Sequence, residues 1–212
     1  MSLAASLWEE NADLARAALE HRFVRSLGDG TLPLGDFQGY VAQDAFFLES
    51  FARAYALALA RSPDRGGVEA FAGLVSGVIE ELTLHEGYAE RWGAPLDGVE
   101  PGEATLAYTE FLLSTAALGG VGETCAAMTP CMRLYAFLGR SLTEEGYDEE
   151  NPYSGWIRTY ADPGFESLAA RLEDLLDRYA DDTPAVRSAY RRAMALEVAF
   201  FEANAETGGG EA

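Results

Sequence analysis

The sequence predicts an all-α fold, chiefly because of how its apolar residues are spaced. These residues recur at intervals of three and four along most of the 212-residue chain, which places them on one face of a helix. No useful length of sequence alternates apolar and polar residues as a half-exposed strand does. Because no repeat or long polar linker divides the chain, we expect one helical domain over residues 1–205 and a flexible tail over residues 206–212.

Glycine and proline residues divide the pattern into about eight expected helices, joined by short connections. The first is expected to run from residue 3 to residue 27 and to stop at Gly28. Two later helices have clear start signals, because Asp162 and Thr183 each place a capping oxygen before a proline at the first helical position. The remaining expected helices are 35–62, 68–92, 102–118, 122–142 with Pro130 in its interior, and the short segment 153–160; the last helix spans 184–205.

The chain is strongly acidic. It has 35 Asp and Glu residues against 15 basic residues, all of them arginine, and a formal net charge of −20. Surfaces that follow phosphates need clustered Lys and Arg, so this charge argues against binding to nucleic acid or to an anionic membrane. With no apolar run of 18 residues and no recognisable secretory signal, we expect a soluble cytoplasmic protein. Acidity combined with the absence of lysine also suggests a halophilic origin, since high salt screens the repulsion among carboxylates.

Two cysteines lie in one apolar stretch, and one of them is a candidate nucleophile. Cys125 and Cys131 are too few for a disulfide framework, and a bridge between them would need a broken helix, so we expect a reducing compartment. Thr129 and Pro130 precede Cys131 and leave two possibilities open. If a helix restarts there, its N-terminus lowers the pKa of the Cys131 thiol. If the helix continues, Pro130 bends it and frees a carbonyl group, as often happens at functional sites. Cys125 is expected to be an inert apolar residue.

Two carboxylates occupy apolar helix faces. Asp44 shares its face with Tyr40, Val41 and the aromatic residues that follow, and Glu197 lies among Met194, Phe200 and Phe201. At the position of Asp44 a carboxylate is paired, hydrogen-bonded or functional. For Glu197 two possibilities stay open: burial raises its pKa toward the range that suits proton transfer near neutral pH, or its face is the rim of the apolar stripe and the carboxylate reaches water. Three tyrosines in apolar segments bring a polar tip to the same core: Tyr108, Tyr135 and Tyr153.

The sequence offers little for a metal or a cofactor. Its two histidines are His21 and His85, and it has no HExxH motif, no cysteine cluster, no GxGxxG and no Walker A motif. Glu81 with His85 is the nearest approach to the Glu-x-x-His pair of a di-iron site, but the spacing is four and there is no second pair. We therefore expect neither metal nor cofactor.

Taken in order, these residues resemble the TenA family, also called thiaminase II or aminopyrimidine aminohydrolase. The ordered set comprises Tyr40-Val41-Ala42-Gln43-Asp44, Thr129-Pro130-Cys131 with Tyr135, Tyr153 with Trp156-Ile157, and Glu197 with Phe200 and Phe201. The resemblance covers about residues 5–205 and implies a haem-oxygenase-like helical bundle without haem, assembled as a homotetramer. It also implies hydrolysis of a small aminopyrimidine, namely 4-amino-5-aminomethyl-2-methylpyrimidine or thiamine itself. The product would be 4-amino-5-hydroxymethyl-2-methylpyrimidine, made in thiamine salvage.

The resemblance further implies a role for each candidate residue. Cys131 would add to the pyrimidine ring as a nucleophile, and Glu197 would move the proton that this addition requires. Asp44 would accept a hydrogen bond from the 4-amino group or bind the adjacent ring nitrogen. The remaining substrate-binding residues would stack on the ring or position the reacting groups: Phe47, Phe200, Tyr108, Tyr135 and Tyr153.

The chain departs from the family pattern at two places. Many members have tyrosine at the position of Phe47, so a hydroxyl contact is lost here. Many members have Pro-Trp where this chain has Met132-Arg133, which changes the expected pocket wall. His85 is a further candidate for a supporting place beside the site.

Two other functions remain open on the sequence. A non-catalytic pyrimidine-binding or indirectly regulatory protein would not need both Cys131 and Glu197. A haem or metal oxygenase would use His21, in the first helix, as its ligand, and the purified protein would then be coloured.

Overall fold

The expected all-α architecture is confirmed by the computed structural model. The structure describes residues 1–94, 96 and 98–205, apart from the side chain of Tyr88, and these residues form helices without any strand. In chain order the helices are α1 (Leu3–Glu10), α2 (Ala12–Glu20), α3 (Arg22–Asp29), α4 (Leu34–Arg61), α5 (Arg65–Trp92), α6 (Glu103–Leu118), α7 (Val121–Glu145), α8 (Ser154–Ala161), α9 (Pro163–Tyr179) and α10 (Pro184–Ala205). The tail predicted over residues 206–212 lies outside the described residues.

The expectation of one continuous first helix is wrong, because the segment forms α1, α2 and α3. Asn11 ends α1, and its buried side-chain amide donates to the Leu7 carbonyl oxygen at 2.8 Å. His21 is extended between α2 and α3, and its ring Nδ1 accepts the Phe23 N–H at 3.2 Å. Side chains that bond to nearby backbone in this way compete with the helix. The third helix also passes Gly28 and ends at Gly30, whose φ of 80° suits glycine.

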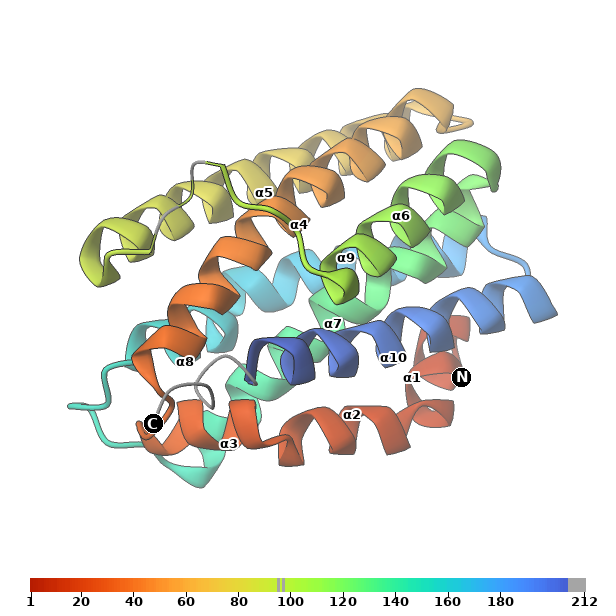
Figure 1. Ribbon diagram of the computed structural model, residues 1–212. Helices are drawn as coiled ribbons and strands as arrows, with labels where there is room; N and C mark the ends of the chain where they lie inside the picture. The colour runs from red at the N-terminus through yellow and green to blue at the C-terminus, as the bar shows by residue number, and fades with distance from the viewer. Residues whose placement is uncertain (95, 97, 206–212) are drawn as a thin grey trace.

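The buried helix α7 organises the bundle. It packs against α6, α8, α9 and α10 and also contacts α4, which lies side by side with α5 along the upper side of the view in Figure 1. Two glycines let its neighbours approach closely: a Cβ on Gly122 would lie 2.4 Å from the Tyr179 carbonyl oxygen, and one on Gly139 would lie 2.5 Å from the Tyr160 carbonyl carbon. Each of these helices, α5 included, contributes side chains to one continuous apolar core. In the part of the chain that is described, no helix is both long and apolar enough to cross a membrane.

Helix α7 also decides between the two possibilities for Cys131. It runs through Pro130 without interruption, so Cys131 lies mid-helix and has no helix N-terminus beside its thiol. Just before the proline, the Thr129 hydroxyl donates to the Cys125 carbonyl oxygen at 2.7 Å, a contact that tends to bend helices. The position of Pro130 therefore shapes the wall on which Cys131 lies, and the thiol must be activated by other groups.

Candidate active site

Six helices bring polar side chains to the middle of the core. Asp44 comes from α4, His85 from α5, Tyr108 from α6, Cys131 from α7 and Glu197 from α10, and all are buried. Asp44, His85 and Glu197 are 4%, 2% and 2% exposed, so each needs a partner to offset the loss of hydration. The sixth helix, α8, adds an aromatic side chain with a hydroxyl group.

A small cavity lies where these helices meet. It is lined by the following residues: Asp44, Phe47, Leu48, Phe51, Glu81, Cys131, Met132, Tyr135, Tyr160 and Phe165. About 260 Å³ lies between the lining atoms, but only about 10 Å³ is open to the centre of a water-sized sphere. The space is thus already shaped by aromatic walls and polar groups, and a heterocycle enters it only if side chains move apart.

Cys131, Glu197 and Tyr108 form a chain of contacts beside this cavity. The Tyr108 hydroxyl donates to Glu197 Oε1 at 2.7 Å, and the Cys131 thiol lies within hydrogen-bonding reach of the same carboxyl group. Burial raises the pKa of Glu197 to about 8, although the hydrogen bond from Tyr108 opposes the rise. Burial also raises the pKa of the Cys131 thiol well above its usual value, and the nearby carboxylates raise it further. Cys131 is therefore a thiol at rest, and Glu197 is the group placed to take its proton.

Asp44, His85 and Glu81 form a second polar group. His85 Nε2 lies 2.7 Å from Asp44 Oδ2, and His85 Nδ1 lies 3.0 Å from the Glu81 carbonyl oxygen. Burial alone would lower the pKa of His85, but the hydrogen bond and charge of Asp44 raise it to about 9. His85 is thus an imidazolium that faces the Asp44 carboxyl group, and the Glu81 carbonyl keeps the ring oriented toward Asp44. The sequence marked His85 as a further candidate beside the site and gave no sign of the contact with Asp44.

Aromatic rings enclose the polar groups. The ring of Phe47 lies 4.7 Å from that of Tyr108 and 6.2 Å from that of Phe200, measured between centroids. Tyr135 accepts a hydrogen bond from the hydroxyl of Tyr40 at 3.3 Å and faces the cavity. Phe47, Tyr108, Phe200 and Tyr135 therefore lie together around Cys131 and Glu197, as a stacking site for a flat ring requires.

Tyr153 lies elsewhere. It precedes the first residue of α8, its hydroxyl donates to the Leu32 carbonyl oxygen at 2.6 Å, and its ring packs on Phe37 and Trp92. Two turns further along α8, Tyr160 lines the cavity instead and donates to Glu81 Oε1 at 2.7 Å. Tyr160 ends the short helical segment that the sequence predicted over residues 153–160, but Tyr153 was singled out in its place.

The sequence matches a known protein family over nearly its whole length. The family model described as TENA/THI-4/PQQC matches residues 8–207. The chain belongs to the TENA/THI-4/PQQC family. Among its relatives, the aminopyrimidine aminohydrolase of Halalkalibacterium halodurans is 35% identical over 185 residues, covering 85% of this chain and 83% of that protein. The bifunctional TH2 protein of Arabidopsis thaliana, a mitochondrial protein, is also 35% identical over 209 residues, and the match covers 85% of this chain but 34% of the plant protein.

Solved structures of TenA proteins confirm the helical fold. A crystal structure of a TenA family transcription regulator from a Silicibacter species superimposes with a TM-score of 0.88, at 29% identity and with 97% of each chain covered. The TenA homologue of Pyrococcus furiosus, at 24% identity, has the same fold with a TM-score of 0.87 over 94% of this chain and 98% of that one.

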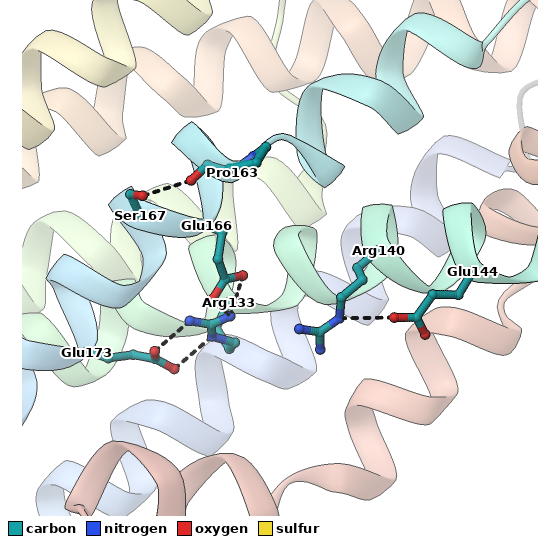
Figure 2. Close-up of polar contacts among 7 residues, drawn as sticks. All are labelled: Arg133, Arg140, Glu144, Pro163, Glu166, Ser167 and Glu173. Carbon is teal, nitrogen blue, oxygen red and sulfur yellow. Dashed lines mark hydrogen bonds and ion pairs between the residues drawn. The ribbon is translucent and has the colours of Figure 1, made fainter.

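This TenA chain departs from the family pattern at Met132-Arg133, and the two side chains lie in different surroundings. Met132 lines the cavity, whereas Arg133 points away from it toward α9. Figure 2 shows Arg133 between Glu166 and Glu173, with nitrogen–oxygen distances of 2.6 to 2.8 Å. The substitution in the family pattern therefore attaches α9 to α7 and adds no charge to the cavity.

The possible metal ligands and the histidine considered for haem are placed as follows in the structure. Among residues 1–94, 96 and 98–205, no three His, Cys, Asp or Glu side chains are grouped to hold a metal ion. Both ring nitrogens of His21 are engaged, Nε2 with Glu202 at 2.7 Å and Nδ1 with the Phe23 N–H. His21 therefore contacts helix α10 and the start of α3 in this structure.

Proposed function

We propose that the protein hydrolyses 4-amino-5-aminomethyl-2-methylpyrimidine, and thiamine as a second substrate, to 4-amino-5-hydroxymethyl-2-methylpyrimidine in thiamine salvage. The observation that carries the proposal is the contact chain of Cys131, Glu197 and Tyr108 on the edge of an aromatic-walled cavity. A protein that only bound the pyrimidine would not need a thiol and a proton-transferring carboxyl side by side. The name of the 35% identical bacterial relative, aminopyrimidine aminohydrolase, supports the same reaction.

The reaction needs a nucleophile because an amine does not leave an unactivated pyrimidine methylene readily. In the proposed sequence, Cys131 gives its proton to Glu197 while sulfur adds to the ring carbon next to the methylene-bearing carbon, and a ring nitrogen takes up the proton. When the ring nitrogen gives this proton back to Glu197, the electron pair moves through the ring, and the amine departs with the C–N bonding pair and carries off the proton from Glu197. Water then adds to the exocyclic methylene and loses a proton to the freed Glu197 carboxylate. The thiolate finally leaves with the C–S pair, which restores the aromatic ring, and regains its proton from Glu197.

Asp44 orients the ring in this proposal. Its carboxylate is already held by His85, so it presents a fixed acceptor to the 4-amino group of the substrate. A buried acceptor left without its donor is costly, so ring analogues that lack the amino group would be rejected.

The test is hydrolysis of both substrates at high KCl, followed by chromatography, for wild type, Cys131→Ser and Glu197→Gln. We expect turnover by the wild type and losses of a hundredfold or more in both variants. Exposed Glu110 on α6 supplies the matched control, Glu110→Gln, which is expected to keep full activity. Turnover of neither substrate by folded wild type would contradict the proposal and favour a binding or regulatory role.

We also infer a homotetrameric assembly in a salt-rich cytoplasm. Several large apolar side chains are exposed on the single chain, among them Leu118 at 83% and Ile79 at 55%, and burial between subunits would remove them from water. Light scattering coupled to size-exclusion chromatography measures the mass; a monomer at molar KCl would contradict this assembly.

A further inference from the structure

A groove lies outside the cavity, between α5, α8 and α9. Its principal side chains are Glu80, Glu81, Leu84, Arg158, Phe165 and Leu168. About 650 Å³ of it is open to the centre of a water-sized sphere, against about 10 Å³ in the cavity. The groove is therefore large enough to hold a group of several heavy atoms that the cavity cannot take.

Two residues belong to both spaces. Glu81 and Phe165 line the cavity on one side and the groove on the other. The Phe165 ring is held edge-on against Tyr160, with centroids 4.9 Å apart, and Glu81 accepts the Tyr160 hydroxyl at 2.7 Å. A molecule whose ring occupies the cavity and whose substituent lies in the groove would thus extend past Glu81 and Phe165.

The polar groups of the groove favour a positive charge. The described residues that line the groove include three acidic ones, Glu80, Glu81 and Asp162, and one basic one, Arg158. Arg158 is exposed and Glu81 is partly buried, so Glu81 provides the charge that is less screened by water. Burial raises the pKa of Glu81 to about 7, with the His85 imidazolium opposing the rise, and a cation placed beside it would favour the carboxylate.

Substrate chemistry places a cation at this point. The methylene that loses the amine is attached next to the ring carbon that Cys131 attacks, and Cys131 and Glu81 line the same cavity of about 260 Å³. The aminomethyl substrate has an ammonium group on that methylene, and thiamine has a thiazolium ring there. Both leaving groups are positively charged, and both would extend toward the groove.

We propose that the groove is the leaving-group site and that Glu81 selects leaving groups that have a positive charge; this inference rests on the proposed hydrolase function. Glu81 acts as the counter-ion of the cation, and Tyr160 fixes its carboxylate at the boundary of the two spaces. Leu84, Phe165 and Leu168 provide the apolar wall that a larger leaving group contacts.

Calorimetric binding to Cys131→Ser near pH 7.5 tests the selection without turnover. The two ligands share one ring: 4-amino-5-aminomethyl-2-methylpyrimidine, a cation, and 4-amino-5-hydroxymethyl-2-methylpyrimidine, a neutral alcohol. We expect the cation to bind at least tenfold more tightly, and the added change Glu81→Gln, which keeps an acceptor for Tyr160, to abolish that preference while leaving the alcohol's Kd within threefold. Glu86→Gln, an exposed change one turn further along α5, is the matched control and is expected to keep the preference.

Turnover separates the two proposals. In an otherwise wild-type chain, Glu81→Gln is expected to raise KM for the aminomethyl substrate about tenfold and to lower kcat by less than threefold. If wild type turns over the substrate but Glu81→Gln leaves KM and the binding preference unchanged, the selection by Glu81 is wrong and the hydrolase function stands. If Glu81→Gln weakens the cation and the alcohol equally, Glu81 supports the pocket and does not select charge. Absence of both binding and turnover in folded wild type would contradict the hydrolase function, and this inference with it.

Discussion

Replacing Glu197 with glutamine is expected to change how stability depends on pH. Glu197 is 2% exposed, and burial raises the pKa of its carboxyl from an ordinary value of 4.5 to about 8. In the unfolded chain the same group is hydrated and keeps its ordinary pKa. Between pH 4.5 and pH 8, the folded state therefore binds a proton that the unfolded state has lost.

The direction and size of the effect follow from this difference in bound protons. Stability falls with rising pH wherever the folded state binds more protons, so the contribution of Glu197 to stability is fully present below pH 4.5 and is lost as the pH rises to about 8. Each pH unit in that interval is worth about 1.4 kcal/mol, so the whole interval is worth at most about 5 kcal/mol. Entry of water beside the ionised carboxylate would reduce this figure, and we expect a measured value of about 2 to 5 kcal/mol. Glutamine has no proton to lose and escapes the penalty.

Urea unfolding near pH 5, 7 and 9 measures the difference between Glu197→Gln and wild type. The other titrating groups, including His85 and Glu81, are present in both proteins and largely cancel from that difference. We expect the free energy of unfolding of Glu197→Gln, relative to wild type, to rise with pH and to exceed its pH 5 value by about 2 to 4 kcal/mol at pH 9. Glu110→Gln, on the exposed face of α6, should show no such trend. Parallel stability curves for wild type and Glu197→Gln would refute the reasoning.

Three further outcomes are expected. Tyr108→Phe removes the hydrogen bond that lowers the pKa of Glu197. In wild type, kcat/KM is expected to rise with pH around pH 8, and in Tyr108→Phe this rise should move to higher pH. If the rise does not move, Glu197 is not the titrating base. Tyr153→Phe loses the bond to the Leu32 carbonyl oxygen and should cost about 1 kcal/mol in urea unfolding while kcat/KM stays within twofold; a large loss of activity would return Tyr153 to the site. The melting temperature should rise between low salt and molar KCl, because screening relieves the repulsion within a chain of net charge −20, and a calorimetric scan that shows no change would contradict a halophilic origin.

The long helices were predictable because glycine and proline mark their ends. The expected bounds 35–62, 102–118 and 184–205 differ by at most one residue from α4, α6 and α10. The first stretch was mispredicted because Asn11 and His21 break it through side-chain bonds to nearby backbone. Such bonds leave the apolar spacing intact, so the pattern gave no sign of the breaks.

The site was predictable to the extent that polar residues interrupt apolar helix faces. Asp44, Cys131 and Glu197 all stood out in this way, and the structure brings them to the same part of the core. The pairing of Asp44 with His85, 41 residues away, depends on how α4 and α5 pack, which no local pattern encodes. The choice between Tyr153 and Tyr160 depends on where α8 begins, and helix ends are the least certain part of a sequence prediction.

The buried polar groups of this core differ in a way that separates structure from chemistry. Tyr55 and Tyr190 have hydroxyl groups with no hydrogen-bond partner among the described residues, and a neutral hydroxyl bears that loss at about 1 to 3 kcal/mol. A buried carboxylate without a partner would cost far more, and Asp44, Glu81 and Glu197 each have one: an imidazolium for Asp44 and a tyrosine hydroxyl for each glutamate. Asp44 thus has a charged partner, whereas Glu81 and Glu197 have neutral tyrosine partners and burial raises their pKa values to about 7 and about 8. The choice of partner therefore separates one acceptor held by an ion pair from two carboxyl groups able to exchange protons near neutral pH.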